Sequence, residues 1–380
     1  MNRSGRYINQ PAGYKAFIPA PLPPDPPIII KGDLQNLLSK ADMSIARLDG
    51  MGHVLPNANL FIAMYVKKEA LLSSQIEGTQ ASLEDLFEFE SGEKLENIND
   101  VAEVVNYVKA LNYGMERLQE FPMSLRLLKD IHAVLMEGVR GGEKTPGEFK
   151  KSQNWIGPAG CTLRDATFVP PPPHEAEKGM GELELYLHNP QQLPILVDCA
   201  LIHYLFETIH PFLDGNGRLG RLLITFYLHR KRVMDKPLLY LSYFFKKNRQ
   251  EYYDRLNMVR DKGDFEQWIA FFLKGVVVTA DSAVDTARNI LELQTTHRNL
   301  LWQKKISSPL AVGILEKLYY TPYVSVNDIA RNFNISYQAA STLVSQLENA
   351  GILKEITGRK RDKRYIYAEY LNILSEGTTL

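Results

Sequence analysis

The chain has 380 residues, of which 45% are hydrophobic and 23% charged, and its 44 basic and 44 acidic side chains give a net charge of zero. This length allows two or three domains, and the composition is that of an ordinary globular protein. A neutral chain has no global field that attracts nucleic acid or membrane, so any such contact needs a local patch. No apolar run approaches the roughly 18 residues of a membrane helix. Two cysteines make no disulfide scaffold, and no signal-peptide core follows the N-terminus. We therefore expect a cytoplasmic protein without membrane contact.

The first 56 residues are expected to form a proline-rich arm and a first helix. Six prolines lie between positions 19 and 27, and prolines at this density favour an extended arm. From Asp33 the apolar residues recur at helical spacing. A second helix is expected from about 57 to 78, where Gly78 is a typical helix stop.

Further helices are expected over 98–118 and 124–139, followed by a loop that ends in four consecutive prolines, Pro170 to Pro173. Two helices then span 174–209, and the second leads into His210. After 275, a long helix with polar faces is expected to form a bridge over 276–307 to a last domain.

The most informative stretch is His210-Pro-Phe-Leu-Asp-Gly-Asn-Gly-Arg-Leu-Gly-Arg221. Its glycines let the backbone approach a ligand closely, and free amides at a helix start bind anions. Arg218 and Arg221 are three residues apart, so they share one helix face and can converge on one anion. Asp214 suits a hard cation such as Mg²⁺, and His210 suits a general base. The stretch predicts a phosphate, a metal and a base at one site.

This string resembles the signature of the Fic family, His-x-Phe-x-Asp/Glu-Gly-Asn-Gly-Arg-x-x-Arg, at every defining position. The resemblance implies an all-α core with a short β-hairpin flap at 164–174, within a Fic domain over 57–275. It also implies a protein adenylyltransferase that moves AMP from ATP to a Tyr, Ser or Thr hydroxyl. In that scheme His210 accepts the hydroxyl proton and Asp214 holds Mg²⁺. The run Gly215, Asn216, Gly217, Arg218, Leu219, Gly220 and Arg221 then binds the phosphates.

Three further features carry implied roles. Ser73-x-x-x-Glu77-Gly78 resembles the family's inhibitory motif, which implies that Glu77 pairs with Arg221 and disturbs the γ-phosphate. The flap, which includes Val169, would pair its main chain with an extended segment of the protein target. Tyr252 and Tyr253 match residues that line the base side of the nucleotide, although an aromatic pair there is usually core.

The last segment, 308–380, resembles a small α+β winged helix. Its expected wing tip, Arg359 to Arg364, has five basic residues and one acidic residue, which suggests DNA. The expected recognition helix, however, is nearly uncharged, which suits a protein contact instead.

Several alternatives stay open. The chain could remove AMP by hydrolysis rather than add it, or act as a DNA-binding regulator with a nucleotide-sensing Fic core. Base selectivity is not written in the motif, so another nucleotide or a phosphocholine donor is also open. The sequence does not identify the target protein. It also leaves open whether the protein modifies itself and whether it forms a homodimer.

Overall fold

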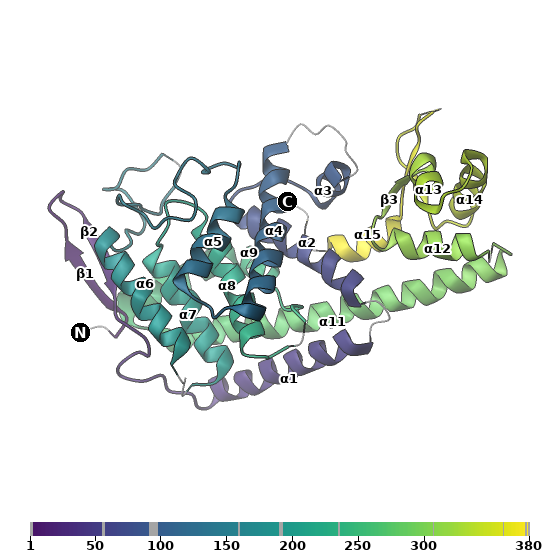
Figure 1. Ribbon diagram of the computed structural model, residues 1–380. Helices are drawn as coiled ribbons and strands as arrows, with labels where there is room; N and C mark the ends of the chain where they lie inside the picture. Colours follow the sequence, from purple (N-terminus) through teal and green to yellow (C-terminus); the bar gives the residue numbers. More distant parts are fainter. Residues whose placement is uncertain are drawn as a thin grey trace.

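A computed structural model describes residues 3–54, 58–90, 98–158, 160–189, 193–234, 236–306, 308–359, 361–376 and 378. Most of this part is helical, with a two-stranded and a three-stranded sheet. Figure 1 shows a helical body joined by one long helix to a smaller unit at the C-terminal end. The expected all-α core with small β elements is therefore confirmed.

The N-terminal arm contains a hairpin that the sequence analysis missed. Strands β1 (Gly5–Asn9) and β2 (Lys15–Pro19) pair antiparallel, in register from Gly5–Pro19 to Asn9–Lys15. The prediction of an extended proline-rich arm was wrong here. Residues 5–10 and 12–18 contain no proline, so both strands can donate hydrogen bonds along nearly their whole length. Helix α1 (Asp33–Val54) follows as expected.

The helical body is built from helices that pack around a buried pair. The outer helices are α2 (Ala58–Ile76), α3 (Leu83–Glu90), α4 (Ile98–Glu120), α5 (Leu125–Leu135) and α6 (Pro173–His188). The buried pair is α7 (Ile195–Ile209) and α8 (Asn216–Arg230), whose side chains are buried on nearly every face. A helix that is apolar all round belongs inside a core. The loop between these two helices therefore has a rigid support on both sides.

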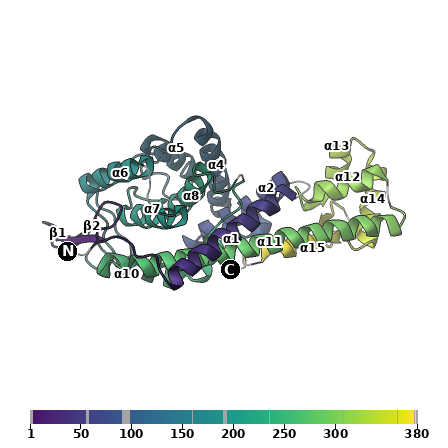
Figure 2. The same cartoon turned by 90° about the horizontal axis from the view of Figure 1, so that it is seen from below.

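Helices α9 (Ser242–Lys247) and α10 (Arg249–Lys262) lead into α11 (Phe265–Gln303), which is one continuous helix of 39 residues. The predicted boundary at 275/276 falls inside it, so the bridge is an extension of a helix that begins in the body. Figures 1 and 2 show α11 running from the body to the C-terminal unit, with α1 beside it. The fully buried Trp268 on α11 donates through Nε1 to the Ala200 carbonyl at 2.8 Å.

The C-terminal unit has the order of elements expected for a winged helix. Its elements are α12 (Pro309–Leu318), β3 (Tyr323–Ser325), α13 (Val326–Phe333), α14 (Tyr337–Asn349), β4 (Lys354–Glu355), β5 (Arg364–Ile366) and α15 (Ala368–Ser375). The strands form an antiparallel sheet in the order β3-β5-β4. A capping box fixes the start of α13, because Ser325 and Asp328 bond each other's backbone amides.

Candidate active site

The candidate site lies in the loop between α7 and α8. Two residues turn the chain: His210 ends α7 with a φ of 49°, and Gly215 precedes α8 with a φ of 74°. The Asn216 side chain closes the loop, since its Oδ1 accepts from the Phe212 amide and its Nδ2 donates to the Phe212 carbonyl, both at 2.9 Å. The Asn216 side chain therefore holds the turn, and the predicted contact of Asn216 with phosphate stays a prediction.

His210 is half-buried, and its backbone carbonyl accepts a hydrogen bond from Asn154 Nδ2 at 3.0 Å. Burial, with the positive charges of Lys150 and Arg260, lowers the pKa of His210 to about 3. The imidazole is therefore neutral near pH 7 and has a lone pair available to accept a proton. Phosphate charges arriving beside this ring would raise its pKa and make it a stronger base.

Two residues that the sequence analysis missed hold the His210 segment in place. Lys150 is buried; its Nζ donates to Asn154 Oδ1 at 2.7 Å and to the Ile209 carbonyl at 3.3 Å. Asn154 also donates to the Phe212 carbonyl at 2.8 Å. Both lie in an irregular loop, so no periodic pattern pointed to them.

His132 on α5 was also missed, although it supports the loop from the other side. Its ring stacks on Phe212 with centroids 3.8 Å apart. The Gly147 amide donates to Nδ1 at 2.9 Å, so the ring hydrogen lies on Nε2, which donates to the Asp214 carbonyl at 2.9 Å. Burial lowers the pKa of His132 to about 4, so the ring is neutral. The only sequence feature that could have pointed to His132 is its position among the apolar residues of the expected helix.

Asp214 presents its carboxylate at the edge of the site, with 35% of the side chain exposed. Oδ1 accepts from the Gly215 amide at 2.7 Å, and Oδ2 pairs with Lys144 Nζ at 2.9 Å. These partners outweigh burial and lower the pKa of Asp214, which keeps it ionised. Within the described residues, no group of three or more His, Cys, Asp or Glu side chains could hold a metal. One carboxylate fits Mg²⁺, which proteins often bind through one or two carboxylates and the phosphates of a substrate.

The start of α8 forms the anion-accepting part of the site. In the part of the chain that is described, no side chain caps this helix, so the first amides and the helix dipole favour an anion. Leu219 and Gly220, which were also predicted to bind phosphate, lie further along α8. Leu219 is fully buried, and the Gly220 carbonyl bonds His203 Nδ1 at 2.9 Å, because the second helical turn already faces the core.

Arg221 is almost fully buried, and residues at the end of α2 hold its guanidinium group. Its Nε donates to Ser73 Oγ at 2.7 Å, and its Nη2 donates to the Ser73 carbonyl at 2.9 Å. The same Nη2 pairs with Glu77 Oε1 at 2.7 Å, so the predicted contact is present. A Cβ placed on Gly217 would overlap the Glu77 carboxylate, which therefore lies directly against the start of α8. Glu77 puts an anionic group where the site accepts anions.

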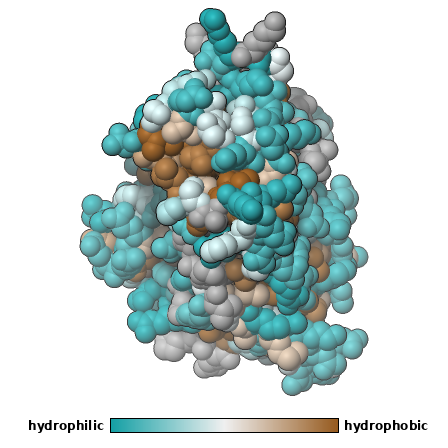
Figure 3. Space-filling model, turned by 90° about the vertical axis from the view of Figure 1, so that its right-hand side faces the viewer, coloured by the Kyte–Doolittle hydropathy of each residue, from teal (hydrophilic) through white to brown (hydrophobic). Residues whose placement is uncertain are grey.

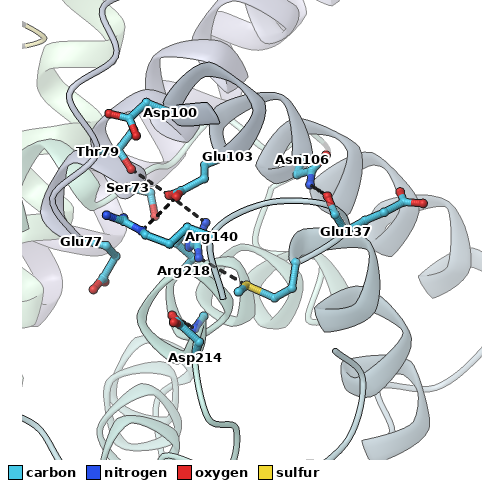
Figure 4. Close-up of polar contacts among 12 residues, drawn as sticks. Ser73, Glu77, Thr79, Asp100, Glu103, Asn106, Glu137, Arg140, Asp214 and Arg218 are labelled. Carbon is cyan, nitrogen blue, oxygen red and sulfur yellow. Dashed lines mark hydrogen bonds and ion pairs between the residues drawn. The ribbon is translucent and has the colours of Figure 1, made fainter. Parts of the chain in front are cut away.

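Arg218 turns to a different carboxylate, which the sequence analysis did not select. Its Nη1 pairs with Glu103 Oε2 at 3.2 Å, and both side chains are buried. Glu103 also accepts a hydrogen bond from Thr79 Oγ1 at 2.9 Å and pairs with Arg140 Nε at 3.3 Å. Figure 4 shows these side chains converging on Glu103. Glu103 lies on α4, far from the motif in sequence, so its pairing with Arg218 required the tertiary structure.

Of the two predicted base-side tyrosines, Tyr252 lies in the core. It is 1% exposed, and its hydroxyl bonds His203 Nε2 at 2.9 Å. Because His203 Nδ1 donates to Gly220, Nε2 accepts from Tyr252. The predicted pocket role therefore fails for Tyr252, while the half-buried Tyr253 stays a candidate.

The predicted flap is smaller than expected. Ile156 and Phe168 form one antiparallel bridge with bonds of 2.9 and 3.0 Å, and Pro173 already opens α6. Residues 173 and 174 are therefore helical, because proline suits the first turn of a helix. On the other edge, the Val169 carbonyl accepts from the Phe17 amide at 3.0 Å, so strand β2 already contacts the flap there.

Taken together, a neutral imidazole, an ionised carboxylate, an open helix start and a buried arginine surround one loop. These features define a helical protein whose site can hold a phosphate group beside a base.

Comparison with known proteins places this class within one family. A model of the Fic/DOC family N-terminal region matches residues 35–116, and a model of the Fic/DOC family matches residues 122–228. The second match contains the whole loop described above. The chain belongs to the Fic/DOC family.

Its relatives include a probable protein adenylyltransferase of Aquifex aeolicus (strain VF5), 27% identical over 202 residues, which are 52% of this chain and 55% of that protein. Protein adenylyltransferase Fic of Aedes aegypti is 29% identical over 183 residues, 47% of this chain and 33% of that protein. The chain thus spans between a third and about half of the length of these curated relatives.

The fold is shared with solved structures. A Fic family protein from Desulfovibrio desulfuricans G20 superposes with a TM-score of 0.59 at 21% identity, covering 90% of this chain and 97% of that one. Among the described residues, no helix has the length and apolar character needed to cross a membrane.

Proposed function

We propose that the protein is an adenylyltransferase that transfers AMP from ATP to a hydroxyl group of a protein. The names of its relatives support this activity. The loop chemistry supports it independently, because a base, an anion-accepting helix start and a metal-compatible carboxylate meet at one place. Positioning and electrostatics are the main contributions that a protein makes to phosphoryl chemistry.

In this proposal, His210 accepts the proton of the target hydroxyl. The freed oxygen attacks the α-phosphorus, the bond to the β-phosphate oxygen breaks, and pyrophosphate leaves. Asp214 would hold Mg²⁺, which neutralises phosphate charge when bound. The amides at the start of α8 hold phosphate oxygens, and Arg221 attracts the leaving group once Glu77 has moved.

The observation that carries the proposal is the position of Glu77. Its carboxylate pairs with Arg221 and lies against Gly217, at the start of α8. A carboxylate and a terminal phosphate cannot share this place, since they would repel each other and compete for one guanidinium. We therefore propose that Glu77 inhibits productive binding of ATP in the resting protein.

The experiment is mass spectrometry of the Glu77→Gly protein incubated with ATP and Mg²⁺, with and without candidate targets. We expect AMP incorporation to rise roughly tenfold to hundredfold over the wild type, because a charged hydrogen bond contributes about 1.5–3 kcal/mol. Glu77→Gln keeps the size of the side chain and should give an intermediate rise.

The control is the double variant Glu77→Gly/His210→Ala. It should bind ATP like Glu77→Gly and transfer no AMP, since the base is gone while the start of α8 is intact. Equal incorporation by wild type and Glu77→Gly would contradict the inhibitory role of Glu77. Transfer by the double variant would show that His210 is not the base.

For the C-terminal unit we propose a contact with another macromolecule. Three basic side chains between β4 and β5 are exposed, which supports binding to DNA: Arg359, Arg361 and Lys363. Tyr337 at the start of α14 is 58% exposed, and Figure 3, which faces this end of the molecule, shows a hydrophobic patch on a largely hydrophilic surface. These features support a protein partner equally, so both alternatives of the sequence analysis stay predictions.

A further inference from the structure

Lys144 contacts the carboxylate that the proposed function assigns to the metal. Its Nζ lies 2.9 Å from Asp214 Oδ2, and 44% of the lysine side chain is exposed. The other oxygen, Oδ1, is taken by the Gly215 amide. The ammonium group therefore occupies the carboxylate oxygen that faces away from the start of α8.

The loop that carries Lys144 is built around Asp214. Gly141 has a φ of 81°, and a Cβ there would overlap the Asp214 carboxylate. The Lys144 amide donates to the Gly141 carbonyl at 2.9 Å, which closes a turn. The next residue, Thr145, has a φ of 51°. A β-branched residue rarely adopts this conformation, and strain of this kind tends to persist at functional sites.

The far end of the loop is tied to the same aspartate. Gly147 donates to Nδ1 of His132, whose Nε2 donates to the Asp214 carbonyl. Lys144 thus lies on a closed ring of contacts that begins and ends at Asp214. An ordinary surface ion pair does not depend on a glycine, a threonine with positive φ and a buried histidine for its geometry.

The pair is nevertheless easy to break. Exposed ion pairs contribute little to stability. A divalent cation that also binds substrate phosphates should displace the ammonium group from Asp214. Once displaced, Lys144 is still held by its loop beside any phosphate oxygen that binds the same ion, and an ammonium group is a good phosphate ligand.

We propose that Lys144 is a substrate-binding residue of this site: it neutralises Asp214 in the nucleotide-free protein and moves to a phosphate oxygen when the metal–nucleotide complex binds. The inference rests on the proposed nucleotide site. It assigns to Lys144 two effects of opposite sign. The residue weakens binding of a free divalent cation, and it strengthens binding of the metal–nucleotide complex.

The first measurement is Mn²⁺ binding without nucleotide, followed by electron paramagnetic resonance. Lys144→Met removes the charge and keeps an unbranched side chain. We expect it to bind Mn²⁺ about threefold to fivefold more tightly than the unsubstituted protein, because the competitor for Asp214 is gone. Lys151→Met, an exposed lysine of the following loop, is the matched control and should change nothing.

The second measurement is calorimetric binding of Mg²⁺ with α,β-methylene-ATP in the Glu77→Gly background. Lys144→Met should weaken this binding roughly tenfold, through loss of a charged contact to phosphate. Lys144→Arg should retain most of the affinity. Thermal unfolding of each variant shows whether the fold is intact.

The outcomes separate the two proposals. Absence of analogue binding by Glu77→Gly itself contradicts the proposed function, and this inference with it. Normal analogue binding by Glu77→Gly that Lys144→Met leaves unchanged contradicts the inference alone. A Mn²⁺ affinity that Lys144→Met does not raise would equally overturn the first half of the role.

Discussion

At the scale of single residues, the site depends on side chains whose pKa values are shifted by their surroundings. His132 and His210 are held neutral because burial disfavours the imidazolium form. Glu207, near Arg221, has its pKa raised to about 7 by burial. Asp214 differs from these, since Lys144 and the Gly215 amide keep it ionised. Neutral histidines thus lie beside a charged carboxylate around one loop.

His132 gives a prediction on the pH dependence of stability. Its pKa falls from 6.5 to about 4 on folding, so the unfolded chain binds the proton first as the pH drops. The stabilisation is complete above about pH 6.5 and is lost as the pH falls through about 4, to a total of roughly 3 kcal/mol.

The test compares wild type with His132→Phe, which keeps the stacking on Phe212 but has no titrating ring. The free energy of unfolding in urea should be lower for the variant at pH 7.5, because two buried partners lose their hydrogen bonds. The gap should shrink toward pH 4.5. Acids with raised pKa values are common to both proteins, so their contributions cancel. A gap that is constant with pH would contradict the role assigned to His132.

At the scale of elements, α2 provides the restraint on the loop and α8 receives it. Ser73 lies within α2 and Glu77 directly follows it, one helical turn later, so both reach Arg221 from the same side. The two hydrogen bonds that Arg221 donates to Ser73 orient the guanidinium group, and Glu77 neutralises its charge. The contact between Glu77 and Arg221 is therefore a property of how the end of α2 packs on α8.

Ser73→Ala tests this arrangement. It removes the Nε contact and leaves the bonds to the Ser73 carbonyl and to Glu77, so AMP transfer should rise by about fivefold, less than for Glu77→Gly. Ser74→Ala is the matched control, since among the described residues the Ser74 hydroxyl has no hydrogen-bond partner. Radiolabel incorporation is measured in the wild type and in the Ser73→Ala, Ser74→Ala and Glu77→Gly variants, which ranks their rates of AMP transfer. Equal rises for both serine variants would point to general loosening of α2.

At the scale of the whole molecule, the C-terminal unit packs against the segment that carries Glu77. Gln75, two residues before Glu77, donates a hydrogen bond from Nε2 to the Thr378 carbonyl at 3.2 Å. Tyr323 on β3 stacks on Phe87 of α3, with centroids 5.5 Å apart. One hydrophobic core includes residues from the body and from this unit. We therefore expect that a change in the C-terminal unit alters the contact between Glu77 and Arg221 through packed side chains.

Tyr323→Ala should loosen this junction. The substitution removes a buried ring, which costs about 3–5 kcal/mol for large aromatic residues, and it should raise AMP transfer several-fold by weakening the support of α2. Thermal unfolding and radiolabel incorporation are measured on the same samples. A lower melting temperature with unchanged incorporation would show that the unit stabilises the fold without influencing Glu77.

The sequence alone determined the helical class and the position of the candidate site, because a run of twelve residues specifies the local chemistry of the loop. It also indicated the pairing of Glu77 with Arg221, through resemblance. The hairpin β1–β2 was missed because a proline-rich segment suggested an extended arm. Tyr252 was misplaced because an aromatic pair has the same pattern in a core and in a pocket.

Only the tertiary structure decided which distant groups complete the site. Glu103 on Arg218, His132 under Asp214 and Lys144 on the Asp214 carboxylate each join residues about 70 to 115 positions apart. Such contacts leave no periodic signal, because they depend on where whole helices and loops pack rather than on local spacing. The motif fixes what chemistry the loop offers, and the packing around it decides which charges are free to act.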